Sequence, residues 1–318
     1  MSQCFKFNLR KSKLKILILG YSNIAKKRFI NYFINKKFKI YLASKSTKEK
    51  ISIFSKQYNS YQEALDKSDA DFVYISLPNS LHFIWAHKAL SLGYHVVVDK
   101  PLCNSVFELN KLIKIAFKKK KLLAEAIFFN YHKQFRKALA LIKEKKNIKE
   151  VRVNFTIPKP KKNTLLASKK FKGGALMDMG PYAAAIARIF FNSKMSFYKI
   201  YVKKDKNSLI KSFKVLINFK SKTYSGEFKF GGSYKNNLTI ITTKKTIILN
   251  RVFSPPSDEN LKLIVKKKKE QSVYKIEKDD CFENFFNEVL KNIKAKKYNS
   301  YISQLKFDNS FRNNILKK

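Results

Sequence analysis

A lysine follows a short, strongly apolar stretch in the first third of the chain. Val96, Val97 and Val98 are too few for a helix and are β-branched, so they predict a strand buried on both faces. Lys100 stands just beyond this strand, and Pro101 then ends the ladder of strand hydrogen bonds. Ligands of open parallel sheets bind beyond the carboxyl ends of the strands, so Lys100 is a candidate for chemistry. The alternative is one more surface lysine in a lysine-rich chain.

Strands and helices alternate through the first half of the sequence. An apolar run over 14–19 ends at Gly20, and helical spacing of apolar residues follows over 22–35. Further strands are predicted over 38–43, 71–77, 95–98 and 122–124, and further helices over 61–67, 81–92, 104–118 and 131–144. This alternation predicts a doubly wound parallel sheet of the Rossmann type.

The turn after the first strand has the composition of a phosphate-binding turn. Residues 20–25 read Gly-Tyr-Ser-Asn-Ile-Ala, a variant of the Gly-x-Gly-x-x-Gly/Ala pattern. Gly20 allows the sharp turn, whereas Ser22 stands where a second glycine normally lets the backbone approach a pyrophosphate. We expect cofactor contacts from Gly20, Ser22, Asn23 and Ile24.

The end of the second strand bears on the choice of nicotinamide cofactor. NAD sites usually place an acidic residue there to hold the ribose 2′-hydroxyl, and none lies between Tyr41 and Lys48. Ser44 and Lys45 could instead hydrogen-bond and neutralise a 2′-phosphate. The sequence therefore favours NADP(H), with NAD as the alternative.

After about residue 148 the pattern changes to closely spaced strands, which predicts a mainly antiparallel sheet. These strands are expected over 151–157, 199–202, 210–219, 223–230, 238–241 and 246–249. A helix over 178–191 would cover one face of that sheet and leave the other for a partner subunit, and helices over 281–294 and 301–316 close the chain. We therefore expect an NAD(P)-binding Rossmann domain over 1–125 and an α+β substrate and oligomerisation domain over 126–318, with the last helix free to pack back on the first domain.

The charge is strongly positive: 68 basic residues stand against 22 acidic ones, a net charge of +46. Only 7 of the basic residues are arginine, and the lysines are spread over the whole length. Base reading and phosphate forks favour arginine, so a specific nucleic-acid role is not expected, although non-specific polyanion binding is. A positive field also favours an anionic substrate or cofactor.

The cysteines and the apolar runs bear on the compartment. Cys4, Cys103 and Cys281 lie far apart without a Cys-x-x-Cys motif, so we expect free thiols in a reducing cytoplasm. The N-terminal apolar run is too short for a secretion signal and no small-residue cleavage site follows it. No run of 18 apolar residues exists, so no membrane span is expected.

Five motifs follow one another along the first 192 residues. They read GYSNIA from residue 20, DFVYISLPNSLH from 71, GYHVVVDKP from 93, AEAIFFNYHKQF from 124 and GGALMDMGPY from 173. Their order and spacing resemble the glucose–fructose oxidoreductase/inositol dehydrogenase/rhizopine-catabolism (Gfo/Idh/MocA) family. The resemblance implies a nicotinamide cofactor on the Rossmann domain, and hydride exchange with a hydroxyl or carbonyl of a sugar, cyclitol or sugar nucleotide. It also implies a homodimer or homotetramer formed through the open sheet.

The resemblance implies catalytic roles for Lys100, Asp178 and Tyr182, which also contact the substrate. The family's Glu-Lys-Pro matches residues 99–101, its Asp matches Asp178, and Tyr182 stands where the family frequently has His. A free tyrosine, with a pKa of about 10, is a poor base at neutral pH, and a neighbouring Lys100 cation would lower that pKa. In reduction, Tyr182 would donate the proton, Lys100 would polarise the carbonyl, and Asp178 would orient Lys100 or a substrate hydroxyl. The alternatives are a core tyrosine at 182 and a helix N-cap at 178.

Other motif positions are implied to bind substrate or cofactor. Glu125 and His132 match motif residues expected at the substrate, whereas Asn130 replaces a frequent Arg. His82 is expected near the nicotinamide or in a capping role, and no metal is expected because the histidines lack ligand spacing. The expected cofactor-binding residues are the turn residues and the two 2′-phosphate candidates named above, together with six others. These six are Leu77, Pro78, Asn79, His82, Asp99 and Lys100.

These inferences predict an NADP(H)-dependent oxidoreductase that acts on sugar-like CH–OH groups. The competing hypothesis is a catalytically inactive nicotinamide-nucleotide-binding protein with a structural or regulatory role. It rests on Ser22 in place of Gly and Asp99 in place of Glu.

Overall fold

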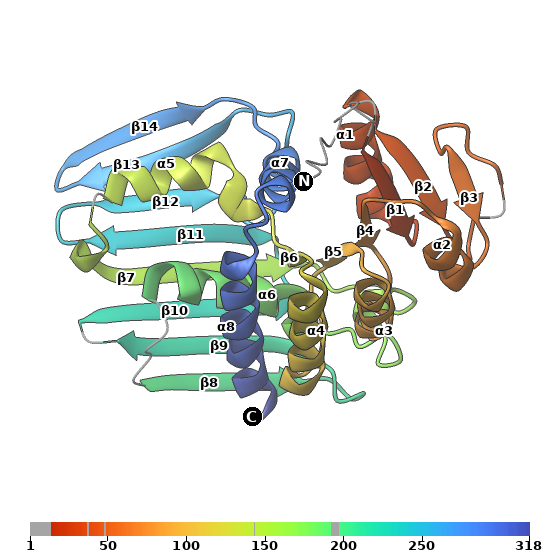
Figure 1. Ribbon diagram of the computed structural model, residues 1–318. Coiled ribbons are helices and arrows are strands. Elements are labelled where there is room, and N and C mark those ends of the chain that lie inside the picture. The colour runs from red at the N-terminus through yellow and green to blue at the C-terminus, as the bar shows by residue number, and fades with distance from the viewer. Residues whose placement is uncertain (1–13, 37, 48, 143, 192–196, 220) are drawn as a thin grey trace, which may run out of the picture.

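Two β-sheets form the framework of the molecule (Figure 1). The computed structural model describes residues 14–36, 38–47, 49–142, 144–191, 197–219 and 221–318. One sheet has six strands in the order β3-β2-β1-β4-β5-β6, all parallel, and the other has eight in the order β14-β13-β12-β11-β7-β10-β9-β8. The expected fold class, a Rossmann-type sheet plus a large and mainly antiparallel one, is confirmed.

The six-stranded sheet reverses its strand order between β1 and β4, which is where doubly wound folds bind their ligands. The valines of β5 are fully buried, as their β-branched run predicts. The three-residue strand β3 was not predicted, because Lys-Gln-Tyr carries no apolar pattern. The strands are β1 Lys15–Leu19, β2 Lys39–Ala43, β3 Lys56–Tyr58, β4 Phe72–Ile75, β5 His95–Asp99 and β6 Leu123–Ala126.

The helices of this half follow the predicted places with shifted ends. Ser60 and Ser105 cap two of them, because each side chain accepts a backbone N–H three residues later. The first helix begins with a π-helical turn over Ala25–Phe29. The α-helices are α1 Ile30–Asn35, α2 Tyr61–Lys67, α3 Asn79–Ser91 and α4 Val106–Lys119.

In the eight-stranded sheet only β7 and β10 pair in parallel, and every other neighbouring pair is antiparallel. β13 and β14 were not predicted, because lysines interrupt the first and the second is largely exposed. The strands are β7 Ile148–Ile157, β8 Phe197–Lys204, β9 Ile210–Phe219, β10 Lys222–Phe230, β11 Lys235–Thr242, β12 Thr246–Asn250, β13 Leu261–Lys267 and β14 Glu270–Ile276.

Helices cover one face of the large sheet, and the last helix joins the two halves (Figure 1). The alanine-rich α6 packs on β9 and β10, where its small side chains allow close approach. α8 contacts α6, α4 and β6, so it lies between the sheets. The helices are α5 Lys133–Ile142, preceded by a 3-10 turn over Phe129–Tyr131, then α6 Ala175–Phe191, α7 Cys281–Lys294 and α8 Asn299–Leu316.

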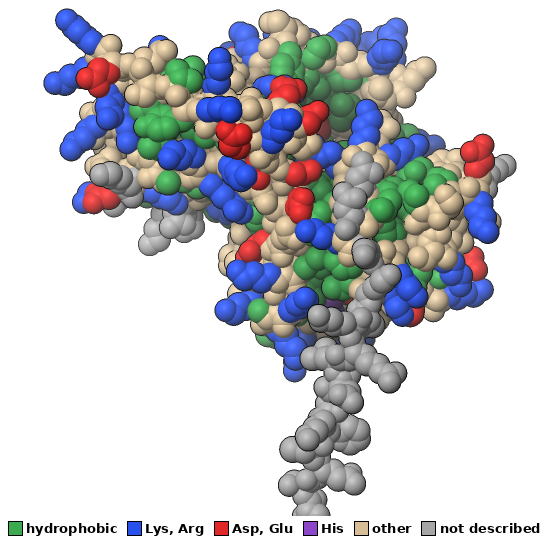
Figure 2. All heavy atoms as spheres, turned by 90° about the horizontal axis from the view of Figure 1, so that it is seen from above, with side chains coloured by type: hydrophobic (Ala, Val, Ile, Leu, Met, Phe, Trp, Pro, Cys, Tyr) green, Lys and Arg blue, Asp and Glu red, His purple; other side chains and the backbone are tan. Residues whose placement is uncertain are grey.

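The surface reflects the composition. Figure 2 shows lysine and arginine side chains scattered over one whole face, with acidic side chains among them, rather than gathered into one stripe. Within the described residues, no helix is long and apolar enough to cross a membrane. Cys103 and Cys281 are buried free thiols, whereas Cys4 and the N-terminal leader lie outside the described residues.

Candidate functional site

Lys100, Asp178 and Tyr182 lie together, although the first is 78 residues from the second in sequence. Lys100 Nζ donates to Asp178 Oδ1 at 2.5 Å and to the Asp178 main-chain oxygen at 2.8 Å. The same nitrogen lies 5.1 Å from the centroid of the Tyr182 ring. The side chains of Lys100 and Asp178 keep 17% and 19% of their surface exposed, so the pair is mostly shielded yet reachable. The lysine is therefore held in place rather than free at the surface.

The glycines before α6 bring Asp178 to Lys100. A Cβ on Gly173 would lie 2.4 Å from the Leu166 main-chain oxygen, and Gly174 has a φ of +98°, which favours glycine. The helix then begins at Ala175, so Asp178 lies inside its first turn and is not the N-cap residue. This excludes the capping alternative for Asp178.

Tyr182 combines a packed ring with a free hydroxyl. Its ring centroid lies 5.9 Å from that of Phe129, 5.7 Å from that of Phe155 and 5.1 Å from that of Phe253. No described residue forms a hydrogen bond with the Tyr182 hydroxyl. The aromatic cluster thus fixes the ring, and the hydroxyl stays available to a ligand.

The electrostatics of this group differ in one respect from the sequence expectation. Burial raises the pKa of the Tyr182 hydroxyl, and the opposing effect of the Lys100 charge is smaller, so the net shift is upward. The expectation that Lys100 lowers this pKa below its ordinary value is wrong, because removal from water outweighs one nearby cation. Burial alone would lower the pKa of Lys100, but the negative charge of Asp178, helped by Tyr182 and Asp99, raises it. At neutral pH the site therefore holds a charged lysine and a protonated phenol.

A chain of hydroxyl groups links the turn after β1 to the end of β5. Asp99 accepts hydrogen bonds from the hydroxyls of Tyr74 and Ser76, the latter at 2.5 Å. Because the single hydroxyl hydrogen of Ser76 goes to Asp99, the Ser22 hydroxyl 2.5 Å away must donate to Ser76. Ser22 Oγ in turn accepts the N–H of Ala25 at 3.2 Å. Ser22 thus ties the phosphate-binding turn to the strand that carries Lys100.

Asp99 was expected to contact the cofactor, but its carboxylate contacts protein hydroxyl groups. Both of its carboxylate oxygens are engaged by protein hydroxyls, and burial raises its pKa against the effect of those hydrogen bonds. Asp99 therefore positions the sheet edge rather than offering a free carboxylate to a cofactor.

Gly20 occupies a position that admits no side chain. Its φ is +94°, and a Cβ there would lie 2.3 Å from the main-chain oxygen of Ser76. Asn23 and Ile24, which open the following helix, are exposed, so their backbone N–H groups can meet an anion. The tight turn and the open helix start fit a nucleotide pyrophosphate.

We expect Gly20→Ala to lower the free energy of unfolding by roughly 2–4 kcal/mol, because it adds a steric clash to a strained φ. Gly231→Ala is the matched control: its φ is +92°, but no atom lies within 4 Å of the added Cβ. It should cost about 1–2 kcal/mol, the backbone strain alone. Urea unfolding of both variants measures the difference, and equal losses would show that the close approach to Ser76 is unimportant.

The proposed 2′-phosphate residues have different environments. Ser44 is buried, and its hydroxyl oxygen lies 3.2 Å from Ser46 Oγ and 3.1 Å from Thr47 Oγ1 while accepting the Ser46 N–H. Ser44 therefore builds the turn, and its contact with a 2′-phosphate stays a prediction. Lys45 and Ser46 are exposed at the end of β2, and Ser46 is a candidate that the sequence analysis missed. A serine three residues after the strand end was the available signal.

The loop after β4 is fixed by buried side chains. His82 is buried, with Nδ1 2.8 Å from the Pro101 main-chain oxygen and Nε2 2.6 Å from that of Leu77. Each ring nitrogen thus lies within hydrogen-bond distance of a main-chain oxygen, so His82 links the loop after β4 to the loop after β5, and its place near a nicotinamide stays a prediction. Asn79 donates to the Lys172 main-chain oxygen at 2.9 Å and so joins α3 to the loop before α6. Leu77 is buried and Pro78 is half-buried at the same edge.

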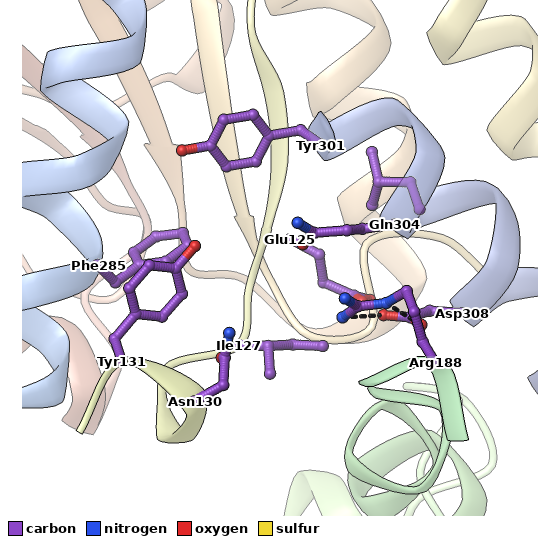
Figure 3. A pocket seen from close by; sticks show the side chains of 10 residues that line it. Glu125, Ile127, Asn130, Tyr131, Arg188, Phe285, Tyr301, Gln304 and Asp308 are labelled. Carbon is purple, nitrogen blue, oxygen red and sulfur yellow. Dashed lines mark hydrogen bonds and ion pairs between the residues drawn. The ribbon is translucent and has the colours of Figure 1, made fainter. Parts of the chain in front are cut away.

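Glu125 is buried and lines a small cavity (Figure 3). Its Oε1 accepts the N–H of Leu102 at 2.7 Å and lies 3.6 Å from Nη1 of Arg312 on α8. In the same small cavity, Arg188 binds both carboxylate oxygens of Asp308 at 2.8 and 3.1 Å. Glu125 therefore supports the loop that follows Lys100, and its contact with a substrate stays a prediction.

His132 is buried, and its Nε2 forms no hydrogen bond with the described residues. Its ring is 1% exposed, its Nδ1 accepts the N–H of Gln134 at 3.0 Å, and burial lowers its pKa. It therefore acts at the start of α5 as a neutral capping group. Asn130, in the 3-10 turn before it, has a buried Oδ1 with no hydrogen-bond partner and faces the cavity of Figure 3.

Comparison with known proteins shows that the sequence is similar to oxidoreductases. Residues 14–127 match the family described as "Oxidoreductase family, NAD-binding Rossmann fold", Gfo/Idh/MocA. The chain is 28% identical over 229 residues, 71% of its length, to dTDP-3,4-didehydro-2,6-dideoxy-alpha-D-glucose 3-reductase from Actinomadura kijaniata. It is 32% identical over 138 residues, 43% of its length, to D-xylose 1-dehydrogenase (NADP(+)) 2 from Haloferax volcanii.

The solved structures extend the likeness to almost the whole fold. A 3-ketoreductase from Actinomadura kijaniata, in complex with NADP and TDP-benzene, superposes with a TM-score of 0.88 at 20% identity, over 96% of this chain and 98% of that one. An aldose-aldose oxidoreductase from Caulobacter crescentus gives a TM-score of 0.83 at 16% identity, over 96% and 97%.

The sequence matches are shorter than the relatives themselves. They span 66% of the curated 3-reductase and 42% of the xylose dehydrogenase. The structural match carries the same fold through both sheets. Residues 14–127 of this chain therefore match the Gfo/Idh/MocA model of oxidoreductases with an NAD-binding Rossmann fold, and the chain as a whole shares its fold with the solved 3-ketoreductase.

Proposed function

We propose that this protein is an NADP(H)-dependent oxidoreductase that transfers hydride between nicotinamide and a hydroxyl-bearing or carbonyl carbon of a sugar, cyclitol or sugar nucleotide. The observation that carries the proposal is the group of Lys100, Asp178 and Tyr182 at the carboxyl edge of the parallel sheet. Relatives named as a sugar-nucleotide 3-reductase and an NADP-dependent xylose dehydrogenase support the reaction class. A solved relative holding NADP supports the cofactor.

The residues of this chain fit a nicotinamide dinucleotide. The Gly20 turn leaves no room for a Cβ, and the exposed start of the next helix presents backbone N–H groups to a pyrophosphate. Lys45 and Ser46 are exposed at the end of β2 for a 2′-phosphate. When bound, the cofactor supplies or accepts the hydride, and the protein must orient the reacting carbon and manage one proton.

The mechanism assigns one task to each of the three residues in carbonyl reduction. Lys100, held charged by Asp178, stabilises the negative charge that develops on the carbonyl oxygen. Tyr182 donates the proton to that oxygen, because its raised pKa keeps the hydroxyl protonated. Asp178 orients Lys100 through two hydrogen bonds, one from its side chain and one from its main chain.

We further propose that a homodimer or homotetramer forms through the large sheet. α6 covers one face, and the other carries outward side chains such as Leu216, Thr239, Ile248 and Ile264, which remain partly exposed. Size-exclusion chromatography with light scattering would test this, and a monomer at micromolar concentration would contradict it.

The first experiment is a fluorescence titration with NADPH and with NADH, followed by a turnover screen over free and nucleotide-linked sugars. Binding with turnover supports the oxidoreductase. Binding without turnover of any sugar would favour the inactive nucleotide-binding protein, for which the engaged Ser22 hydroxyl and the Asp99 network are the motivating features.

Lys45→Glu should weaken NADPH binding about tenfold and leave NADH binding unchanged, because it replaces a cation at the proposed 2′-phosphate position with an anion. The matched control is Lys119→Glu, which makes the same charge change at the exposed C-terminal end of α4. It should leave binding of both cofactors unchanged. Equal losses for both cofactors in Lys45→Glu would contradict the assignment of the 2′-phosphate to Lys45.

A further inference from the structure

The last helix, α8, reaches the loop that directly follows Lys100. Arg312 on α8 is buried, and its Nη2 donates to the main-chain oxygen of Cys103 at 3.5 Å, across 209 residues of sequence. Its Nη1 lies 3.6 Å from Glu125 Oε1, the atom that accepts the Leu102 N–H at 2.7 Å. Two consecutive residues of the loop are therefore held by this arginine, one directly and one through Glu125.

The stem of the same arginine packs on the helix that carries the other two residues of the candidate site. A Cβ on Gly180 would lie 3.3 Å from Arg312 Cγ and 3.4 Å from Arg312 Cδ, so the missing side chain lets the stem lie close against α6. Gly180 stands midway between Asp178 and Tyr182 in the sequence. Arg312 thus contacts both segments of the site, the loop after Lys100 with its guanidinium and α6 with its stem.

A gain in stability does not account for this arginine. Its side chain is only 6% exposed, and its Nε and Nη1 form no hydrogen bond with the described residues. Removing a guanidinium and a carboxylate from water costs about as much as their attraction returns, so a buried pair with few hydrogen bonds adds little to the free energy of unfolding. The distinctive feature of Arg312 is therefore the pair of segments that it joins.

We infer that Arg312 is a positioning residue for the reaction: it holds the loop that presents Lys100 against α6, so that the lysine keeps its place beside Asp178. Asn309, three residues earlier on the same helix, donates to Cys103 Sγ at 3.3 Å and acts on the same loop. The inference rests on the proposed function, because the rate of hydride transfer reports where Lys100 stands. A misplacement of about 1 Å far from the reacting atoms is enough to lower a rate about 10²-fold.

Steady-state kinetics of the full-length protein test the role of Arg312. Arg312→Gln should lower kcat for carbonyl reduction about 10–100-fold and leave the KM for NADPH unchanged, because the phosphate-binding turn is not touched. Arg312→Lys keeps the cation but lacks the fork that spans Glu125 and Cys103, so it should restore only part of the rate. The lysine variant keeps the buried carboxylate paired and therefore serves where the glutamine variant does not fold. Native kcat in Arg312→Lys and in folded Arg312→Gln would overturn the inference.

The matched control is Arg188→Gln, which removes another arginine that contacts α8. Arg188 binds both carboxylate oxygens of Asp308 at 2.8 and 3.1 Å, and among the described residues these hydrogen bonds join α6 to α8 without reaching the loop after Lys100 (Figure 3). Urea unfolding should show a loss of stability in both glutamine variants, because each leaves a buried carboxylate without its cation. Only Arg312→Gln should lose activity, and kcat of Arg188→Gln should change by less than about twofold. Equal falls in kcat would show that general docking of α8 matters, and would overturn the inference.

Hydrogen exchange reports the position of the loop without any turnover. Pro101 has no amide hydrogen, so the hydrogen-bonded N–H of Leu102 is the first amide of the loop, and fragmentation mass spectrometry follows its exchange. Exchange at Leu102 should be at least about tenfold faster in Arg312→Gln than in the native protein, and unchanged in Arg188→Gln. Native exchange at Leu102 in Arg312→Gln would overturn the inference and leave the proposed function intact. Faster exchange in a protein that turns over no sugar would support the hold of Arg312 on the loop and count against the oxidoreductase.

Discussion

Lys100→Ala is expected to reduce kcat about 10²–10⁴-fold in the carbonyl-reduction direction, the range spanned by removal of a positioned charge or acid–base group. Lys100 is the only cation that the structure places against both Asp178 and Tyr182 among the described residues. Its loss removes the charge that stabilises the developing alkoxide and leaves the Asp178 carboxylate in its place. Steady-state kinetics with the sugar substrate measure the effect.

The same variant should bind NADPH with little change, because the phosphate-binding turn and the end of β2 are not touched. Lys199→Ala, which removes an exposed lysine on β8, is the matched control and should keep full activity. Full turnover in Lys100→Ala would remove the central assignment of the mechanism. A loss accompanied by failure to bind NADPH would instead indicate a damaged fold.

Tyr182→Phe should also reduce the rate of carbonyl reduction about 10²–10⁴-fold, because the ring keeps its packing while the proton donor is lost. The sign of the pH dependence follows from the raised pKa of the hydroxyl. The acid form persists through neutral pH, so reduction by the native protein should be flat there and should fall only as the pH rises toward the raised pKa. Oxidation needs the phenolate as base and should therefore rise with pH over the same range.

Profiles of kcat/KM against pH for both directions check this assignment. The alkaline limb should disappear in Tyr182→Phe and persist in Tyr224→Phe, a buried tyrosine under α6 whose hydroxyl donates to the Ala183 main-chain oxygen. A native profile with a reduction rate that falls between acid and neutral pH would contradict a high-pKa donor. It would point to a group that loses its proton near neutrality.

The two departures from the usual motif residues make physical sense together. Ser22 adds a hydroxyl in the turn, and that hydroxyl leads through Ser76 to Asp99, next to Lys100. The link between Ser22 and Asp99 cannot be read from the sequence, because it passes through Ser76, which lies on a third segment of the chain. The chain of hydroxyls joins the phosphate-binding turn to the strand that presents Lys100, so cofactor binding and lysine position share one hydrogen-bonded unit.

The sequence by itself determined the alternation of strands and helices in the first half and the position of Lys100 beyond a buried strand. These follow from local properties: β-branched runs, helical spacing of apolar residues, and glycines where the backbone admits nothing larger. Asp178 and Tyr182 were indicated only by the resemblance that the order of the motifs carries. The edge strands β3 and β14 each bury only one residue and gave no periodic signal, whereas β13, which lies next to the edge, was missed because lysines interrupt its apolar residues although it buries Leu261, Leu263 and Val265.

Only the tertiary structure decided which polar residues face a ligand and which support the framework. Glu125, His82 and Asp99 stand in the motifs, yet their side chains are engaged by neighbours from other segments of the chain. A buried polar group must find such partners, and they are specified by packing rather than by spacing along the chain. The direction of the Tyr182 pKa was decided in the same way, because the balance between burial and the Lys100 charge depends on how deeply α6 places the ring.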